Sequence, residues 1–308
     1  MDDRAGITHL LLPLWQQLSP EFGEKLRQAQ AELTEAQDQT QQWNLYFRFS
    51  AKLARLSGKK ALENTHWRCD QLIRLQLIQI LALTNGRWPS AREERGCLNH
   101  WVPALFQQSD TEEKIVLLKA LPYLDTDGQL VPFSLLASRT NDPKLFSGLL
   151  LNNDYAITHF DTKGFHQILL KALFMDLDIS QVSGLSRRLN AELSQLAIDL
   201  VMERVYANRK PPPSIWLAIR GCDMDAAFRT TYLGFLAANE ENCRYYSALA
   251  LLLNGVDGFD ERLTQQLQQQ IKHEPSELIR QTQHCLLQHL LFHLGCEDQQ
   301  VNPIEASS

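Results

Sequence analysis

Basic and amide side chains recur between residues 139 and 192, inside segments that are otherwise apolar. Arginine captures carboxylate or phosphate groups through two parallel hydrogen bonds, and asparagine and glutamine both donate and accept. These residue types therefore predict a polar pocket for a ligand that carries anionic or carbonyl groups. The set comprises Arg139, Asn141, Asn153, Gln167, Lys171, Arg187, Arg188 and Asn190.

The lysine of this set leaves room for two other interpretations. Lys171 interrupts the apolar run ILLKALF, so its ammonium must find a partner or extend to solvent, and Gln167 shares its helix face. An enzyme would use Lys171 with Glu192 or His166 for proton transfer on a carbonyl- or phosphate-bearing substrate. In a purely structural interpretation, the asparagines cap helices and Arg188 pairs with Glu192 at i, i+4.

Two adjacent arginines stand in the stretch SGLSRRLNAELSQLAIDL, residues 183–200, directly before an expected apolar helix. The start of a helix carries partial positive charge and favours anions, so two arginines there need a reason. We expect Arg188 to turn inward toward a carboxylate or a bound anion, and Arg187 to remain in solvent.

Two clusters contain possible metal ligands. The carboxylates of Glu192, Asp199 and Glu203 line one flank of the expected helix, which is more typical of a solvated or ion-paired edge. Near the C-terminus, thiol and imidazole ligands recur at four, four and three residues, but helical turns about 5.4 Å apart cannot aim all of them at one ion. We predict no metal site and no cofactor. The weak candidates are Cys285 and His289, within the set Cys285, His289, His293 and Cys296.

A basic stripe at helical spacing occurs nearer the N-terminus. A solvated helix face is the default interpretation, and docking of an acidic partner or of lipid headgroups is the alternative. The stripe comprises Arg48, Lys52, Arg55 and Lys59.

Helical periodicity dominates the chain, and no sustained two-residue alternation predicts strands. Asp142 and Pro143 have the residue types of a helix start, and the proline run within 208–216 separates one helix from the next, which begins near Ser214. Residues 22–42, rich in glutamine and glutamate, predict an exposed helix and a linker. The other expected helices lie in residues 67–84, 112–124, 164–177, 183–200, 226–238, 244–253 and 279–294.

The spacing of these segments is roughly two helices per about 40 residues, the scale of HEAT and armadillo units. The sequence therefore predicts an all-α fold: a HEAT/armadillo-like helical repeat array, or α-solenoid, with no significant sheet. Because helix pairs in such an array pack mainly on their neighbours, no internal boundary is needed. We expect a single domain over residues 1–296 and a disordered tail over 297–308.

Composition excludes several functional classes. The 308 residues are 44% hydrophobic and carry a net charge of -6, which argues against a general nucleic-acid binder and against adsorption to anionic membranes. The acidic start lacks the pattern of an export signal, and no apolar run is long enough to span a bilayer. The six cysteines are scattered without paired spacing. We expect a cytoplasmic protein, with peripheral association with the inner membrane as an extension.

Several motifs follow one another in an order that resembles the EboA-domain family of metabolite traffic proteins. The resemblance is densest over residues 121–216, and it does not extend beyond about residue 257. The motifs are NLYFRFSAKLARLSGKKAL (44–62), LPYL (121–124), SRTND (138–142), NNDYAITHFD (152–161), FHQILLKALFMDLDI (165–179) and GLSRRLNAELSQLAIDLVMERVYANRKPPPSIW (184–216).

The resemblance implies a bacterial protein, encoded in a conserved gene cluster, that helps move a secondary-metabolite precursor toward the cell envelope. It implies no catalytic residues. It adds Tyr155 and Glu192 to the ligand set, whereas Asp154, Ala156 and His166 depart from the family pattern and alter the expected loop at 152–161. Family positions are matched by Arg139, Thr140, Asn141, Asn153, Tyr155, Gln167, Lys171, Gly184, Leu185, Arg188, Asn190, Glu192, Leu193, Arg204 and Trp216.

Together these observations predict a non-catalytic binding or scaffold protein with a polar pocket around residues 139–192. Its expected partners are a small-molecule metabolite, other proteins of the same gene cluster, or both, and no nucleic acid. The open alternatives are an enzyme that uses Lys171 and Glu192, and a scaffold that binds only proteins.

Overall fold

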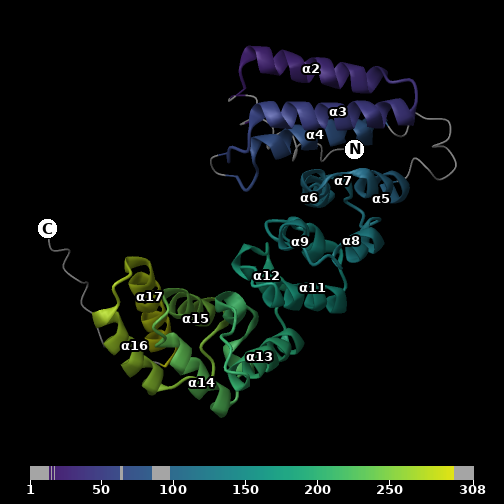
Figure 1. Cartoon of the computed structure of the whole chain (residues 1–308). Helices are drawn as coiled ribbons and strands as arrows, with labels where there is room; N and C mark the ends of the chain where they lie inside the picture. The colour runs from purple at the N-terminus through teal and green to yellow at the C-terminus, as the bar shows by residue number, and fades with distance from the viewer. Residues whose placement is uncertain (1–13, 15, 17, 63–64, 85–97, 295–308) are drawn as a thin grey trace. The chain divides into compact units, whose positions relative to one another are not determined.

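The computed structural model describes residues 14, 16, 18–62, 65–84 and 98–294. Within this part of the chain the regular elements are helices, and the only extended pairing is an isolated bridge between Ala61 and Arg68 (Figure 1). The all-α prediction is confirmed for the described residues. The predicted tail at 297–308 lies outside them.

Backbone contacts divide the chain into two compact units, residues 1–165 and 166–308. Each unit is described by itself, and the single domain over residues 1–296 stays a prediction. The first unit contains α2 (Pro20–Glu35), α3 (Gln39–Ser57), α4 (Cys69–Thr84), α5 (Leu98–Gln108), α6 (Thr111–Lys119), α7 (Leu121–Leu124), α8 (Val131–Ala137), α9 (Pro143–Leu150) and α10 (Tyr155–His159).

The helix α11 (Thr162–Phe174) contains the boundary between the two units. The second unit continues with η3 (Ile179–Gln181), α12 (Leu185–Arg188), α13 (Ala191–Tyr206), η4 (Pro213–Ala218), η5 (Gly221–Asp223), α14 (Ala226–Leu236), α15 (Glu241–Asn254), α16 (Glu261–His273) and α17 (Glu277–His293).

The predicted helices are present, although the segment 112–124 is divided into α6 and α7. The apolar helix expected after the two arginines begins at Ala191 with Asn190 as its N-cap, and the short helix α12 precedes it. The helix expected near Ser214 is present as the 3₁₀ helix η4. The helix start at Asp142 and Pro143 is confirmed, since the Asp142 carboxylate accepts from the Lys144 amide at 2.9 Å.

The first unit is built around α4, which packs against α2, α3 and α6. Figure 1 shows α2, α3 and α4 lying alongside one another. The helix α2 lies mostly within the polar segment 22–42, yet Leu26, Ala29 and Leu33 are buried on one of its faces. The prediction of an exposed helix therefore holds only for its outer face.

A carboxylate is buried in the first turn of this central helix. Asp70 is 2% exposed and accepts two parallel hydrogen bonds from Arg68, both 2.9 Å long. It also accepts a bond of 3.0 Å from Arg74, which lies one turn later. Two guanidinium groups thus neutralise a charge that would otherwise be costly to bury.

The same arginine connects α4 to two other helices. Arg68 donates to Glu112 on α6 (2.6 Å), and Glu112 accepts from Lys59, just beyond α3 (2.7 Å). Desolvation raises the pKa of Glu112, but the hydrogen bonds from Lys59 and Arg68 outweigh it and lower this pKa to about 2. The charged groups therefore hold α3, α4 and α6 in one arrangement.

The second unit has an aromatic core around η4. Trp216 is buried, and its ring lies 5.0 Å from that of Tyr232 and 4.8 Å from that of Phe235. Asn254 on α15 donates to the carbonyls of Leu217 and Ile219, both at 3.0 Å. Because η4 lacks α-helical hydrogen bonds, this side chain supplies donors to carbonyls at its end.

We predict that Asp70→Asn lowers the free energy of unfolding by about 3–5 kcal/mol, because the buried Arg74 and the half-buried Arg68 lose the charge that compensates them. Urea titration followed by circular dichroism measures the change. The matched control is Glu24→Gln on α2, which breaks an exposed ion pair with Arg27 and should cost less than about 1 kcal/mol. Equal losses in the two variants would contradict the prediction.

Candidate functional site

Four of the predicted ligand residues belong to the first unit. Arg139 and Asn141 are exposed in the turn between α8 and α9. Asn153 and Tyr155 are buried, at the start of α10. The four residues therefore differ in environment, and the buried pair has specific partners.

Asn153 is 4% exposed, and both the nitrogen and the oxygen of its side-chain amide form hydrogen bonds with the backbone. Its Nδ2 donates to the carbonyls of Leu118 and Gly148, each at 2.9 Å, and its Oδ1 accepts from the Tyr155 amide at 2.9 Å. These bonds connect the ends of α6 and α9 to the start of α10. The geometry matches the structural interpretation of this asparagine.

Tyr155 donates its hydroxyl proton to the buried carboxylate of Asp125 at 2.6 Å. Asp125 also accepts from the amides of Leu130 (2.6 Å) and Asp127 (3.2 Å). Desolvation raises the pKa of Asp125, but these hydrogen bonds outweigh it and keep this pKa below its usual range. The carboxylate therefore fixes the loop before α8, and Tyr155 anchors that loop to α10.

The two arginines lie at a helix end and not at a helix start. Arg187 and Arg188 occupy the last turn of α12, where the partial negative charge of the backbone favours cations. Arg187 is exposed and Arg188 is half-buried. The Arg187 side chain covers Gly184, whose φ of 65° and lack of a side chain permit that approach. The expected electrostatic conflict at the double arginine does not arise.

Three polar residues of the second unit meet where α11 and α13 begin. The Asn190 Oδ1 accepts from the Leu193 amide at 2.9 Å, which turns the Asn190 Nδ2 toward His166 Nε2, 3.4 Å away. An amide nitrogen can only donate, so Nε2 accepts and the ring proton of the neutral imidazole lies on Nδ1. The cap thus sets the tautomer of His166.

The protonated nitrogen of His166 lacks a hydrogen-bond partner among the described residues, although it is buried. It lies 3.8 Å from a carboxylate oxygen of Glu192, too far for a direct hydrogen bond. The Glu192 side chain is 70% exposed. The arrangement therefore places one buried donor near one exposed acceptor. Sequence analysis placed His166 only in the enzymatic alternative.

The remaining predicted residues of α11 differ in exposure. Gln167 is exposed, and Lys171, one turn later, is half-buried. The proposed ligand roles of these two residues stay predictions.

Sequence analysis missed a lysine with an unusual environment in the first unit. Lys119, at the end of α6, donates to the His66 carbonyl at 2.8 Å and to the Gln71 side chain at 3.1 Å. Its Nζ lies 4.2 Å from the centre of the Trp67 ring. Desolvation, followed by repulsion from Arg68, lowers the pKa of Lys119 to about 8. All of these partners lie about 50 residues away in sequence, so no local pattern identifies the site.

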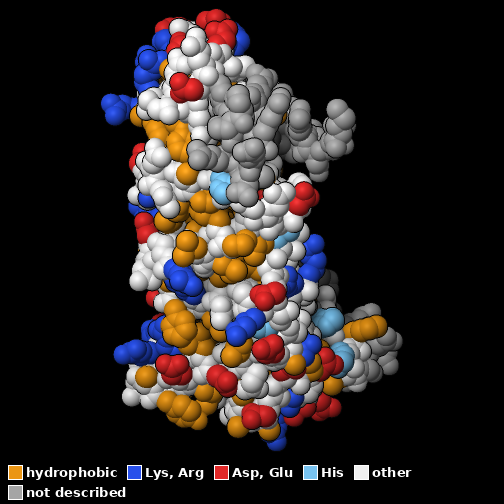
Figure 2. All heavy atoms as spheres, turned by 90° about the vertical axis from the view of Figure 1, so that its right-hand side faces the viewer, with side chains coloured by type: hydrophobic (Ala, Val, Ile, Leu, Met, Phe, Trp, Pro, Cys, Tyr) orange, Lys and Arg blue, Asp and Glu red, His pale blue; other side chains and the backbone are white. Residues whose placement is uncertain are grey.

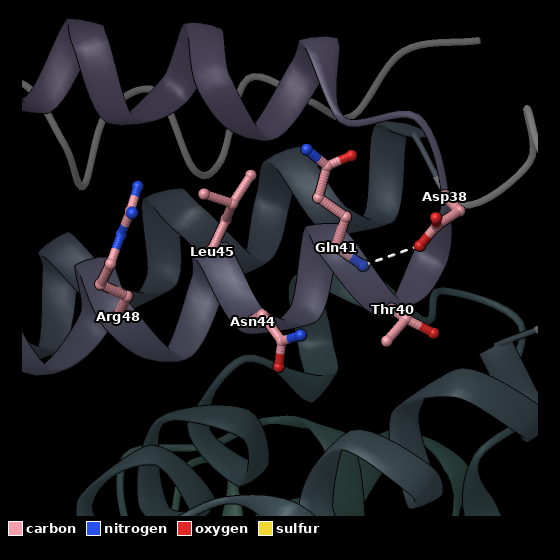
Figure 3. Close-up of a pocket in the computed structure, with 6 residues that line it drawn as sticks. All are labelled: Asp38, Thr40, Gln41, Asn44, Leu45 and Arg48. Atoms are coloured by element: carbon pink, nitrogen blue, oxygen red, sulfur yellow. Dashed lines mark hydrogen bonds between the residues drawn. The ribbon is translucent and has the colours of Figure 1, made fainter.

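A surface groove of about 420 Å³ runs along α3. In Figure 3 the side chains of Gln41, Leu45 and Arg48 extend toward α2, whereas Thr40 and Asn44 extend away from it. Arg48 is held by an ion pair with Glu32 at 2.8 Å. The residues named here as lining the groove come from one helix and its N-cap Asp38, so they do not enclose a ligand.

A second cavity, of about 440 Å³, lies in the second unit where the turn after α14 meets the turn after α16. Arg244 donates to both carboxylate oxygens of Glu274, at 2.7 and 2.8 Å, and to the carbonyls of Ala238 and Asn239. The charged groups of this cavity are therefore occupied by one another, and they join the two turns.

The predicted metal candidates remain dispersed. In the part of the chain that the structure describes, no group of three or more histidine, cysteine, aspartate or glutamate residues could hold an ion. Cys285 and His289 are exposed on α17, and Cys296 lies outside the described residues. Glu192, Asp199 and Glu203 are exposed on α13, where Asp199 accepts from Gln195 at 2.8 Å.

Charge is mixed on the face drawn in Figure 2, where lysine and arginine groups alternate with aspartate and glutamate. In the predicted basic stripe, Arg48 pairs with Glu32 and Lys59 pairs with Glu112, while Lys52 and Arg55 are exposed. Among the helices described, none combines the length and the apolar character needed to cross a bilayer.

The chain matches the model of a known protein family. A family model described as metabolite traffic protein EboA matches residues 9–220, which is more than half of the chain. No curated protein and no solved structure matches significantly.

We predict that Asn153→Ala lowers the free energy of unfolding by at least about 2 kcal/mol, because two buried carbonyls lose a donor and a buried amide loses its acceptor. Chemical denaturation measures the loss. Asn141→Ala is the matched control: its side chain is exposed, so its effect should stay within about 0.5 kcal/mol. Indistinguishable stabilities would refute the structural assignment of Asn153.

Lys119 should react with acetic anhydride as an amine that loses its proton near pH 8. A lowered pKa means that the neutral, nucleophilic form is populated above pH 8, whereas an ordinary lysine needs about pH 10.4. Mass spectrometry of Lys119 labelling between pH 6 and pH 11 measures the midpoint. The same chain unfolded in urea is the control, and identical midpoints in the folded and unfolded chains would disprove the desolvation argument.

Proposed function

The chain belongs to the EboA family of metabolite traffic proteins, and on this premise we propose that it is a non-catalytic carrier for a metabolite. The match to the family model over residues 9–220 is the observation that carries the proposal. In the finer form of the proposal, the cargo is a bacterial secondary-metabolite precursor that moves toward the cell envelope. The carrier acts in the cytoplasm or at the inner membrane, with other proteins of its gene cluster.

The binding residues that we propose within the second unit are His166, Asn190 and Glu192. All three lie inside the region that matches the family. A ligand hydroxyl could accept from His166 Nδ1 and donate to the Glu192 carboxylate. A hydroxyl oxygen beside the 3.8 Å line that joins the two atoms could contact both, after a side-chain shift that exposes the buried His166 Nδ1. The cap bond of Asn190 supports this role, because it holds the donor tautomer before any ligand arrives.

Other residues of the polar set extend this proposal. Gln167, Lys171 and Arg188 belong to the same unit and supply an amide and two cations. For Arg139, Asn141, Asn153 and Tyr155 a ligand role remains a hypothesis, and Asn153 and Tyr155 already have structural partners. Anionic or carbonyl groups on the metabolite would suit the cations of this set.

We further propose that each unit stacks its helices as HEAT and armadillo proteins do. The order of packing supports this: α2 with α3, α3 with α4, α4 with α6 and α6 with α9 in the first unit. In the second unit α14 packs on α15, and α17 packs on both α15 and α16. Several of these contacts join consecutive helices, as in a helical repeat, whereas α6 with α9 and α15 with η4 join elements that are further apart in sequence.

One observation favours a second function. His166 and Glu192 form a potential acid–base pair, since an imidazole and a carboxylate at 3.8 Å can exchange a proton through a bridging hydroxyl. An enzyme of this kind would act on a carbonyl- or phosphate-bearing molecule, with Lys171 as an additional cation. A purely protein-binding scaffold would need neither residue.

Native mass spectrometry of the protein purified from its own host tests the carrier. We expect an additional mass that is released unchanged on denaturation. Glu192→Gln should reduce its occupancy at least about tenfold, because a charged acceptor is lost. Glu203→Gln, which changes another exposed carboxylate on the same helix, is the matched control and should retain the ligand. A chain without bound mass would contradict the carrier, and conversion of the bound molecule during incubation would identify an enzyme.

A further inference from the structure

The last described helix, α17, has an apolar stripe on its exposed face. Leu278 is 59% exposed and Phe292 is 71% exposed, and the thiol of Cys285 is free and exposed between them. These three residues are spaced by seven, so they lie within about 40° of one another around the helix. The opposite face of α17 packs on α15 and α16. The stripe lies outside residues 9–220, so the family match does not account for it.

The spacing of the stripe is symmetric about its centre. Leu278 precedes Cys285 by seven residues and Phe292 follows it by seven, so each lies about 10 Å from Cys285 along the helix axis. If a second α17 lies antiparallel with a two-fold axis through Cys285, each Leu278 meets the Phe292 of the other copy. The two thiols then face each other. An isologous interface requires this kind of self-complementary pattern.

The charges on the helix fit the same arrangement. The chain has a net charge of -6, so two copies of the chain repel each other in general. From Gln281 to Leu294, however, α17 contains no aspartate, glutamate, lysine or arginine. Two copies can therefore approach along this face without like-charge repulsion.

Under this symmetry, polar residues beside the stripe also face polar residues of the other copy. Gln281 and Gln288 lie on one flank of the stripe, and the two-fold axis brings Gln281 of one copy beside Gln288 of the other. On the other flank, Thr282 comes beside His289. Gln281 Nε2 donates to Glu277 and the Thr282 hydroxyl donates to the Leu278 carbonyl, so the oxygens of these two residues can accept from Gln288 and His289 of the other copy.

We propose that α17 is a homodimer interface in which two copies of the helix pack antiparallel around Cys285. A single pair of helices buries less area than the roughly 1,600 Å² of a stable complex, so the dimer is weak and reversible. Its free thiols make it open to capture by oxidation, in which two thiols form one S–S bond and lose two protons and two electrons to an added oxidant.

Cysteine cross-linking tests the contact. Cys97, Cys222 and Cys296 are first replaced by serine. The cysteines that are left in the chain are then Cys285, which is exposed, and Cys69 and Cys243, which are buried. Copper-phenanthroline supplies the oxidant, and non-reducing electrophoresis with peptide mass spectrometry should show a dimer linked through Cys285. A chain that stays monomeric under these conditions would overturn the proposal.

The direction of packing has its own test. On a background that also carries Cys285→Ser, the variants Leu278→Cys and Phe292→Cys are prepared separately. Neither should cross-link alone, because identical positions lie about 20 Å apart in an antiparallel pair. An equimolar mixture should give the mixed disulfide. Cross-linking of Leu278→Cys with itself would instead demonstrate a parallel pair and refute the antiparallel interface.

Sedimentation velocity measures the association without cross-linking. Phe292→Glu places an unpaired charge against the apolar Leu278 of the other copy and should raise the dimer dissociation constant at least about tenfold, while circular dichroism confirms the fold. The matched control is Leu136→Glu, an exposed apolar residue of α8, which should leave the constant unchanged. Equal association of both variants would show that α17 is not the interface.

Discussion

The first unit depends on one buried charge, the carboxylate of Asp70. It stands in the first turn of a helix that is buried on nearly all sides, where an isolated ion would be strongly disfavoured. Arg68 and Arg74 bring compensating charge, and Arg68 continues the network to Glu112 and Lys59. Since each ion needs the next, α3, α4 and α6 cannot shift independently. The low pKa of Glu112 and the low pKa of Lys119 are two consequences of this crowding.

Elsewhere, polar side chains form hydrogen bonds with backbone groups that regular secondary structure leaves without a partner. Short helices end often, and every end exposes carbonyl and amide groups that need partners. Asn153 supplies donors to two such carbonyls, Asn254 supplies donors to two more, and Asp125 accepts from two loop amides. A chain of many short helices therefore needs buried asparagine and aspartate for its architecture. Such residues resemble binding residues when only the sequence is known.

The proposed binding residues differ from this structural set in one respect. The structural side chains have their hydrogen-bonding capacity filled by the protein, whereas His166 presents a proton to a carboxylate that is too distant to accept it. The side-chain amide of Asn190 favours the tautomer of His166 that carries its proton on Nδ1. An unmet donor beside an exposed acceptor is what a small hydroxylated ligand can complete.

The sequence by itself determined the family, the helical class and most of the helix starts. These properties depend on residues within about four positions of one another: apolar spacing, the Asp142–Pro143 start and the Asn190 cap. The short helix α12 before that cap was not predicted. Only the tertiary structure decided which polar residues are satisfied. Lys119 meets Gln71 and His66, and Asn153 meets Leu118, across 35 to 53 residues. Burial and pairing at such separations arise from packing between helices, and local sequence spacing contains no information about it.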